Sequence, residues 1–136
     1  MCEVSGVRST TRRFDMGLIQ RFEDIQAWQE ARILVKMIYV LTNKEQFAKD
    51  YGMKDQVRRA VVSAMTNIAE GFDCESKLEF ARFLGIARRS AVEVQSLLYA
   101  ALDVSYISQN EFDTHYEQAR KTKALIGGFK RSLGKK

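Results

Sequence analysis

The sequence predicts an all-α fold, an antiparallel up-and-down four-helix bundle, and three features of the chain support this prediction. The 136 residues contain no proline and only 8 glycines, so little in the chain would break a long helix. Apolar residues recur at three- and four-residue spacing in four separate segments, which is the period of one helix face. The connections between these segments are short, and short connections favour antiparallel neighbours.

The chain is expected to divide into three parts. Residues 1–21 show no helical period and are rich in Ser, Thr, Arg and Gly, so we expect a flexible N-terminal extension. Residues 22–133 carry the four helical patterns and are expected to form the bundle. Residues 134–136 are expected to form a short basic tail.

The first helix is expected to begin at Asp24, a residue type that caps helices, and to end near Thr42. Residues 33–41 are apolar at every position except Lys36, so this helix is apolar almost all round. A helix of that kind is buried on more than one side. In a small domain this pattern indicates contact with a second subunit, and we therefore expect a homo-oligomer.

The second helix is expected over residues 54–70 and should stop at Gly71, because glycine readily adopts the left-handed conformation that ends a helix. A polar linker, residues 43–52, precedes it, and the linker's aromatic residues Phe47 and Tyr51 are expected to anchor it to the core.

The third and fourth helices, residues 76–104 and 108–133, both open with a capping box, in which a serine is followed three residues later by a glutamate. The fourth helix contains the pair Gly127 and Gly128, where we expect it to kink or fray. The two capping boxes are Ser76 with Glu79 and Ser108 with Glu111.

The positive charge of the chain lies at its C-terminal end. Seven of the 22 basic residues and none of the 17 acidic ones follow residue 119, and together they account for the whole net charge of +5. A cationic stripe attracts RNA or DNA, and basic residues in the last turns of a helix also complement its dipole, so charge alone leaves both roles open. The candidate nucleic-acid-binding residues are Arg58, Arg88, Arg89, Arg120, Lys121, Lys123, Lys130, Arg131, Lys135 and Lys136.

A row of polar residues follows one face of the second helix. This row comprises Gln56, Arg59, Ser63, Asn67 and Glu70. We favour a structural role, in which Arg59 pairs with Glu70 or Glu93, because a carboxylate inside a phosphate site would repel the ligand. Arg58 should project about 100° away from this row and is the better candidate for solvent or nucleic acid.

No catalytic signature is present, and we expect no enzyme, metal or cofactor. The chain lacks a phosphate-binding glycine loop, an HExxH motif and a nucleophile elbow. Cys2 and Cys74 cannot form a zinc site with the single His115, so we expect both cysteines to be reduced and His115 to be a surface or interface residue. No segment approaches the roughly 20 apolar residues that cross a membrane, and none resembles a secretory signal, so we expect a cytoplasmic protein.

The segments FEDIQAWQEA, YGMKDQVRRAVVSAMTNIAEGF and EFARFLGIARRSAVEVQSLL resemble the 23S rRNA intervening-sequence protein family over residues 22–133. One departure from the family's pattern, at Ala64 and Met65, concerns packing. The residues that match the family's longest motif are Asp55, Gln56, Arg58, Arg59, Ser63, Asn67, Glu70 and Gly71.

The resemblance implies a small bacterial four-helix bundle that assembles as a homopentamer, often around a central channel. Some members are encoded within insertions in 23S ribosomal RNA genes, which implies RNA as a partner. The family is also similar to the accessory protein of diversity-generating retroelements, which binds nucleic acid and a reverse transcriptase. We therefore expect a non-enzymatic homo-oligomer that binds structured RNA, with a protein-interaction scaffold, or an accessory subunit such as one for a reverse transcriptase, as the alternative.

Overall fold

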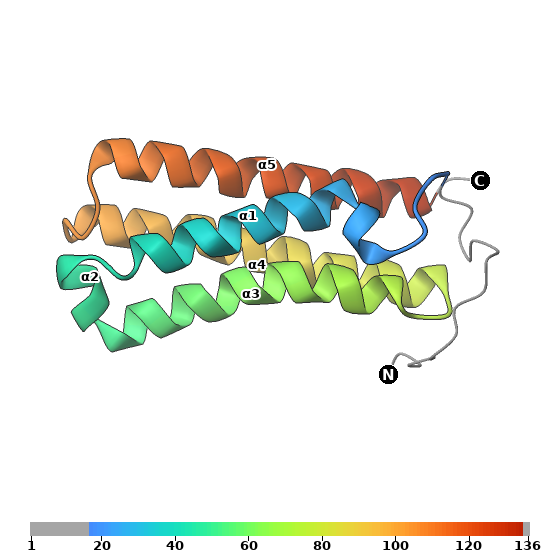
Figure 1. Cartoon of the computed structure of the whole chain (residues 1–136), viewed down its shortest axis with the longest axis horizontal. Helices are drawn as coiled ribbons and strands as arrows, with labels where there is room; N and C mark the ends of the chain where they lie inside the picture. Colours follow the sequence, from blue (N-terminus) through green and yellow to red (C-terminus); the bar gives the residue numbers. More distant parts are fainter. Residues whose placement is uncertain (1–16, 135–136) are drawn as a thin grey trace.

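The computed structural model describes residues 17–134, and within that range every regular element is helical, which confirms the predicted all-α class. The long helices α1, α3, α4 and α5 lie side by side and alternate in direction (Figure 1). In chain order the elements are the 3₁₀ turn η1 (Phe22–Asp24), α1 (Gln26–Leu41), α2 (Glu45–Lys49), α3 (Tyr51–Phe72), α4 (Lys77–Asp103) and α5 (Gln109–Leu133).

Each long helix packs against two of the others. Helix α1 packs on α3 and α5, and α4 packs on the same two helices, so α1 and α4 lie diagonally across the molecule. The surface formed by α4 and α5 is therefore opposite the surface formed by α1 and α3. This arrangement separates the two sites described below.

The core consists of two groups of buried side chains, one towards each end of the helices. One group includes Leu34 of α1, Val61 of α3 and Phe47 of α2. The other includes Ile25, Phe80 of α4 and Ile126 of α5. Most of the apolar positions that the helical period predicts are buried; they include Ala31, Ile38, Val57, Ala60, Ala64, Ile68, Leu84, Ala87, Ala91, Val94, Leu98, Phe112 and Ala119.

Helix α1 begins at Gln26, two residues later than predicted, and Asp24 is not its cap. Asp24 instead ends the 3₁₀ turn η1, and its carboxylate accepts hydrogen bonds from the backbone N–H groups of Gln20 at 3.0 Å and Arg21 at 3.3 Å. The same carboxylate chemistry that caps helices thus stabilises the turn before the helix. The sequence correctly indicates that Asp24 accepts backbone hydrogen bonds, but the prediction that Asp24 caps the first long helix is wrong.

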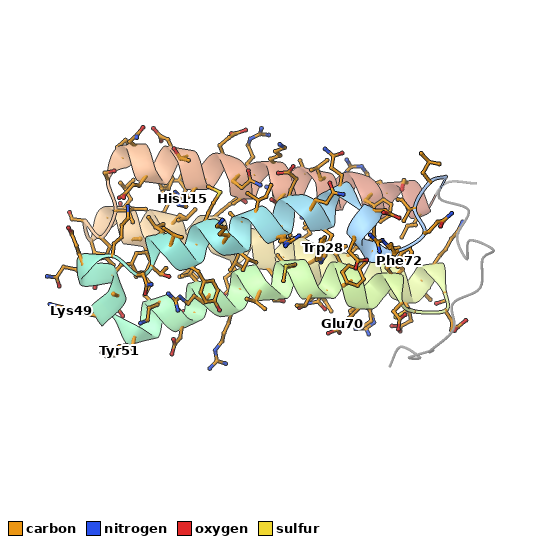
Figure 2. The ribbon with its side chains drawn as sticks, in the orientation of Figure 1. Trp28, Lys49, Tyr51, Glu70, Phe72 and His115 are labelled. Atoms are coloured by element: carbon orange, nitrogen blue, oxygen red, sulfur yellow. The ribbon has the colours of Figure 1, made fainter. Side chains whose placement is uncertain are left out.

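Helix α3 begins at Tyr51, earlier than predicted, because Asp50 caps it. The Asp50 carboxylate accepts hydrogen bonds from the Met53 backbone N–H at 3.0 Å and from the Tyr106 hydroxyl at 2.8 Å. The linker also holds the short helix α2, which was not predicted. Of its two expected anchors, Phe47 is buried, whereas Tyr51 is 70% exposed at the α2 end of the molecule (Figure 2).

We expect Asp50→Asn to destabilise the protein at neutral pH but not in acid. The hydrogen bonds from Met53 and then from Tyr106 lower the pKa of the Asp50 carboxyl below its usual 3.8. Such a group stabilises the fold above its unfolded pKa, and the contribution is lost as the pH falls through the lower folded value. Urea unfolding at neutral pH and below pH 3.8 should therefore show a difference between the two proteins that shrinks in acid. A difference independent of pH would contradict this account.

Gly71 does not end α3 through a left-handed conformation, so that prediction is wrong. The helix continues to Phe72, and Gly71 is buried within it. A Cβ atom at Gly71 would lie 2.8 Å from Cδ1 of Phe80 and 2.8 Å from Cβ of Phe83, both on α4. Glycine is therefore needed at this position because α3 and α4 approach closely, and not because the chain turns there.

Helices α4 and α5 have the serine caps that the sequence predicts. The Ser108 capping box is complete, whereas Ser76 accepts from the Glu79 N–H while the Glu79 carboxylate pairs with Arg82. Helix α5 runs from Gln109 to Leu133 as one helix, so the expected break at its glycine pair is absent.

The oxidation state of Cys74 differs from the prediction. Cys74 lies directly after α3, is buried, and is disulfide-bonded, so it is not the reduced thiol that the sequence analysis expected. Cys2 lies outside the described residues.

His115 is half-buried on α5, with its Nδ1 atom 2.7 Å from the Glu111 carbonyl oxygen (Figure 2).

Candidate nucleic-acid interface

Two arginines from different helices meet over Gly127 of α5. A methyl group placed on Gly127 would lie 3.4 Å from Nε of Arg88 on α4 and 3.4 Å from Nη1 of Arg131 on α5. Both guanidinium groups therefore border the same glycine, and their positive charges lie close together. Because Gly127 has no side chain, the two long side chains can lie against the helix at this point.

A second pair of basic residues meets over Gly85 of α4. A methyl group placed there would lie 3.6 Å from Cε of Lys130 on α5 and 3.7 Å from Nη1 of Arg89 on α4. Each pair again combines one residue from each helix. We call the four residues Arg88, Arg89, Lys130 and Arg131 the basic cluster.

The local sequence explains why the basic cluster forms. On each helix a glycine precedes the basic residues by three and four positions, so both lie on one helix face. Helices α4 and α5 are antiparallel neighbours (Figure 1). The glycine of each helix lies beside a basic residue of the other, Gly127 beside Arg88 and Gly85 beside Lys130. Guanidinium nitrogens of Arg88, Arg89 and Arg131 and the end of the Lys130 stem then lie over the two glycines.

The charges of the basic cluster are not neutralised within the described part of the chain. All four side chains are exposed, and none of them forms an ion pair or hydrogen bond through its side chain with residues 17–134. The cluster therefore presents three guanidinium groups and one ammonium group to solvent. It can bind anions, and arginine forks match the oxygens of a phosphate group.

Other basic candidates already have carboxylate partners. Arg120 Nη2 lies 2.6 Å from Glu117 Oε2, and this contact raises the pKa of Arg120 and lowers that of Glu117. Lys121 Nζ lies 3.5 Å from Oε1 of Glu30 on α1. These pairs reduce the attraction that Arg120 and Lys121 can offer to an external anion.

Arg58 and Arg59 have exchanged the roles that the sequence analysis expected. Arg58 does not project into solvent: its guanidinium lies 4.2 Å from the centre of the Tyr39 ring, and its Nε donates to Thr42 Oγ1 at 2.8 Å. Arg59 is exposed and forms no ion pair with Glu70, Glu93 or any other residue between 17 and 134. The two arginines together line a surface depression, described below.

The remaining polar row lies mainly between α3 and α4. Ser63 Oγ lies 2.8 Å from Ser90 Oγ, the Asn67 side chain donates to Ser63, and Gln56 Nε2 donates to Glu93 at 3.3 Å. The contacts of Ser63 with Ser90 and of Gln56 with Glu93 join α3 to α4, whereas the contact of Asn67 lies within α3. Of the other predicted residues, Glu70 and Asp55 are exposed, Lys123 is half-buried, and Lys135 and Lys136 lie outside the described residues.

Four of the ten basic candidates lie together in the structure. They meet over two glycines, Gly85 and Gly127, which the sequence analysis did not connect with them. The spacing of Gly85 before Arg88 and of Gly127 before Lys130 is visible in the sequence. Its meaning depends on the register between two antiparallel helices, which periodicity alone does not give. In residues 17–134 no group of His, Cys, Asp and Glu could hold a metal ion. No helix in that range is long and apolar enough to cross a membrane.

Comparison with known proteins identifies one family. The family described as 23S rRNA-intervening sequence protein matches residues 23–128, which is well over half of the chain. A crystal structure of a protein of unknown function from the S23 ribosomal protein family of Bacteroides thetaiotaomicron superposes with a TM-score of 0.72. It covers 80% of this chain and 98% of its own, at 19% identity, so this likeness shows the fold alone. No curated protein matches the chain.

Proposed function

This chain belongs to the 23S rRNA-intervening sequence protein family, and on that basis we propose that it is a non-enzymatic protein that binds structured RNA through the basic cluster on α4 and α5. The observation that carries the proposal is the convergence of four unneutralised cations from two helices over Gly85 and Gly127. We place this activity in the cytoplasm, where ribosomal RNA is found.

The basic cluster favours recognition of the RNA backbone. Its members carry guanidinium and ammonium groups, which bind phosphates, and it contains no aromatic side chain on which a base could stack. Phosphate contacts fix the position of a nucleic acid but carry little sequence information. The spacing of phosphates in a folded RNA would then determine which RNA fits.

Binding through phosphates must depend steeply on salt. Each neutralised phosphate contributes a slope of about −0.7 to −0.9 in a plot of log affinity against log salt concentration, so four contacts predict a slope near −3. Fluorescence anisotropy with a labelled rRNA fragment, repeated from about 50 to 200 mM salt, measures this slope. Affinity that does not change with salt would contradict the proposal.

We also propose that the four long helices form a bundle that is the unit of a homo-oligomer, with the pentamer as the assembly that the family resemblance implies. An apolar stripe on α1 supports an additional contact: Ile33 is 47% exposed and Val40 is 58% exposed, with the half-buried Met37 between them. These three positions lie at four- and three-residue steps, hence on one face. Five copies would also bring five basic clusters to one RNA and raise the overall affinity.

We expect light scattering at micromolar concentration to give the mass of an oligomer, and Val40→Lys to lower that mass. Lysine at an exposed position leaves the fold of a single chain intact but places a charge inside the proposed subunit contact. Circular dichroism of the variant provides the control for folding. A wild-type protein that is monomeric under these conditions would contradict the oligomer.

The alternative is a scaffold that binds another protein, and the same α1 stripe is the observation that favours it. In that case the basic charge would serve solubility, or support a partner such as a reverse transcriptase. An oligomer with no salt-dependent RNA binding would favour this alternative over RNA binding.

A further inference from the structure

A depression of about 430 Å³ lies between α1 and α3, on the surface opposite the basic cluster. It is lined by Tyr39 of α1 and by four residues of α3, namely Asp55, Arg58, Arg59 and Val62. The depression is open to solvent, so a ligand bound there would stay partly exposed. The lining combines two cations, one carboxylate, one aromatic ring and one aliphatic side chain.

The Arg58 guanidinium is held in place before any ligand arrives. It lies 4.2 Å from the centre of the Tyr39 ring, its Nε donates to Thr42 Oγ1 at 2.8 Å, and its Nη2 is 3.3 Å from the Tyr39 carbonyl oxygen. The Thr42 hydroxyl is itself fixed, because it donates to the Ile38 carbonyl oxygen at 2.8 Å. Nη1 of Arg58 makes no hydrogen bond to residues 17–134, so one edge of a fixed cation remains free for an anion.

Arg59 and Asp55 supply one further charge of each sign. Both are exposed, and neither forms an ion pair with any residue that the structure describes. Two arginines favour a phosphate, which accepts several charge-assisted hydrogen bonds. The Asp55 carboxylate would weaken the binding of a bare anion, but it can accept hydrogen bonds from hydroxyl groups of the same ligand.

We propose that this depression binds a phosphorylated nucleoside, either free or at the end of an RNA strand. The phosphate group contacts Arg59 and the free edge of Arg58, and Asp55 accepts hydrogen bonds from the ribose hydroxyls. The base packs against Val62 and against the part of Tyr39, a residue that is 40% exposed, that Arg58 leaves uncovered. A nucleoside phosphate uses all five lining residues, whereas inorganic phosphate would use only the arginines and would meet the repulsion of Asp55.

Isothermal titration calorimetry with AMP, GMP, CMP and UMP tests the free ligand, and a short oligonucleotide with and without a 5′-phosphate tests the strand end. We expect at least one of these phosphorylated ligands to bind more tightly than adenosine, than the unphosphorylated oligonucleotide and than inorganic phosphate. Arg59→Ala should weaken that binding about tenfold or more, the loss expected for one charged contact. Asp55→Asn removes the repulsion of phosphate but keeps one acceptor oxygen, so it should reduce the preference for the phosphorylated nucleoside over inorganic phosphate. Neither variant disturbs a described ion pair, so both should fold.

Arg82→Ala is the matched control, because Arg82 is an exposed arginine of α4 outside the depression. Binding by a mononucleotide assigns a free ligand, and binding by the phosphorylated oligonucleotide alone assigns a strand end. No binding by any of these ligands, or equal losses in Arg59→Ala and Arg82→Ala, would overturn the proposal. Because the depression and the basic cluster lie on opposite surfaces, failure here leaves the proposed RNA contact on α4 and α5 intact.

Discussion

Replacing all four residues of the basic cluster by glutamine is expected to lower the affinity for RNA on the order of 100-fold at moderate salt, and to flatten the salt dependence. Four phosphate contacts are removed, so the slope of log affinity against log salt should become shallower by about 3. Glutamine preserves helix propensity and much of the side-chain volume, and these exposed residues form no described ion pair. The fold should therefore survive. Anisotropy titrations at several salt concentrations measure both effects.

The matched control removes the same amount of charge from basic residues that have carboxylate partners. Its four substitutions replace Lys44, Arg82, Arg120 and Lys121 by glutamine. Both variants lower the net charge of the chain from +5 to +1, so any general effect of charge is the same in the two. The control should retain most of the affinity. Equal losses in the two variants would show that net charge, and not the cluster, attracts the RNA.

Gly71→Ala is expected to destabilise the protein by about 1–2 kcal/mol, although alanine is the better helix former. The new methyl group would lie 2.8 Å from Cδ1 of Phe80 and from Cβ of Phe83, and such overpacking costs roughly 1–3 kcal/mol. The gain in helix propensity offsets up to about 1 kcal/mol of this. Chemical denaturation followed by circular dichroism measures the change.

Gly128→Ala is the matched control for that experiment. A methyl group at Gly128 meets only Nη2 of Arg131, at 3.8 Å, which is an ordinary contact with the end of a flexible side chain. We expect this variant to be more stable than wild type by roughly 0.5–1 kcal/mol, through helix propensity alone. Equal destabilisation by both substitutions would contradict this account, because the loss at Gly71 would then not come from its close contact with Phe80 and Phe83.

The long helices could be predicted because their signals are local. Serine caps at Ser76 and Ser108 and the apolar period of each segment depend on residues within a few positions of one another. The predictions were wrong where one residue type can serve two structural roles. Asp24 is the last residue of a 3₁₀ turn that its carboxylate stabilises, where a helix cap was predicted. Gly71 permits close packing where a helix end was predicted.

The site was predicted less completely because it depends on neighbours in space. Arg58 and Arg59 both flank the apolar stripe of α3, and the helical period cannot say which of them faces α1. The partners of Arg120 and Lys121 were not predicted either, although all the carboxylates are visible in the sequence. The convergence of Arg88 and Arg131 over Gly127 depends on how α4 and α5 are aligned along their length.

The most direct test of RNA binding at the basic cluster is photo-cross-linking of the protein to a thiouridine-containing rRNA fragment, followed by mass spectrometry of the linked peptides. The account predicts that cross-links concentrate near residues 85–89 of α4 and 127–131 of α5, and that the four-glutamine cluster variant loses them. Cross-links confined to α1 and α3, or unchanged in that variant, would contradict the assignment of the RNA contact to the basic cluster.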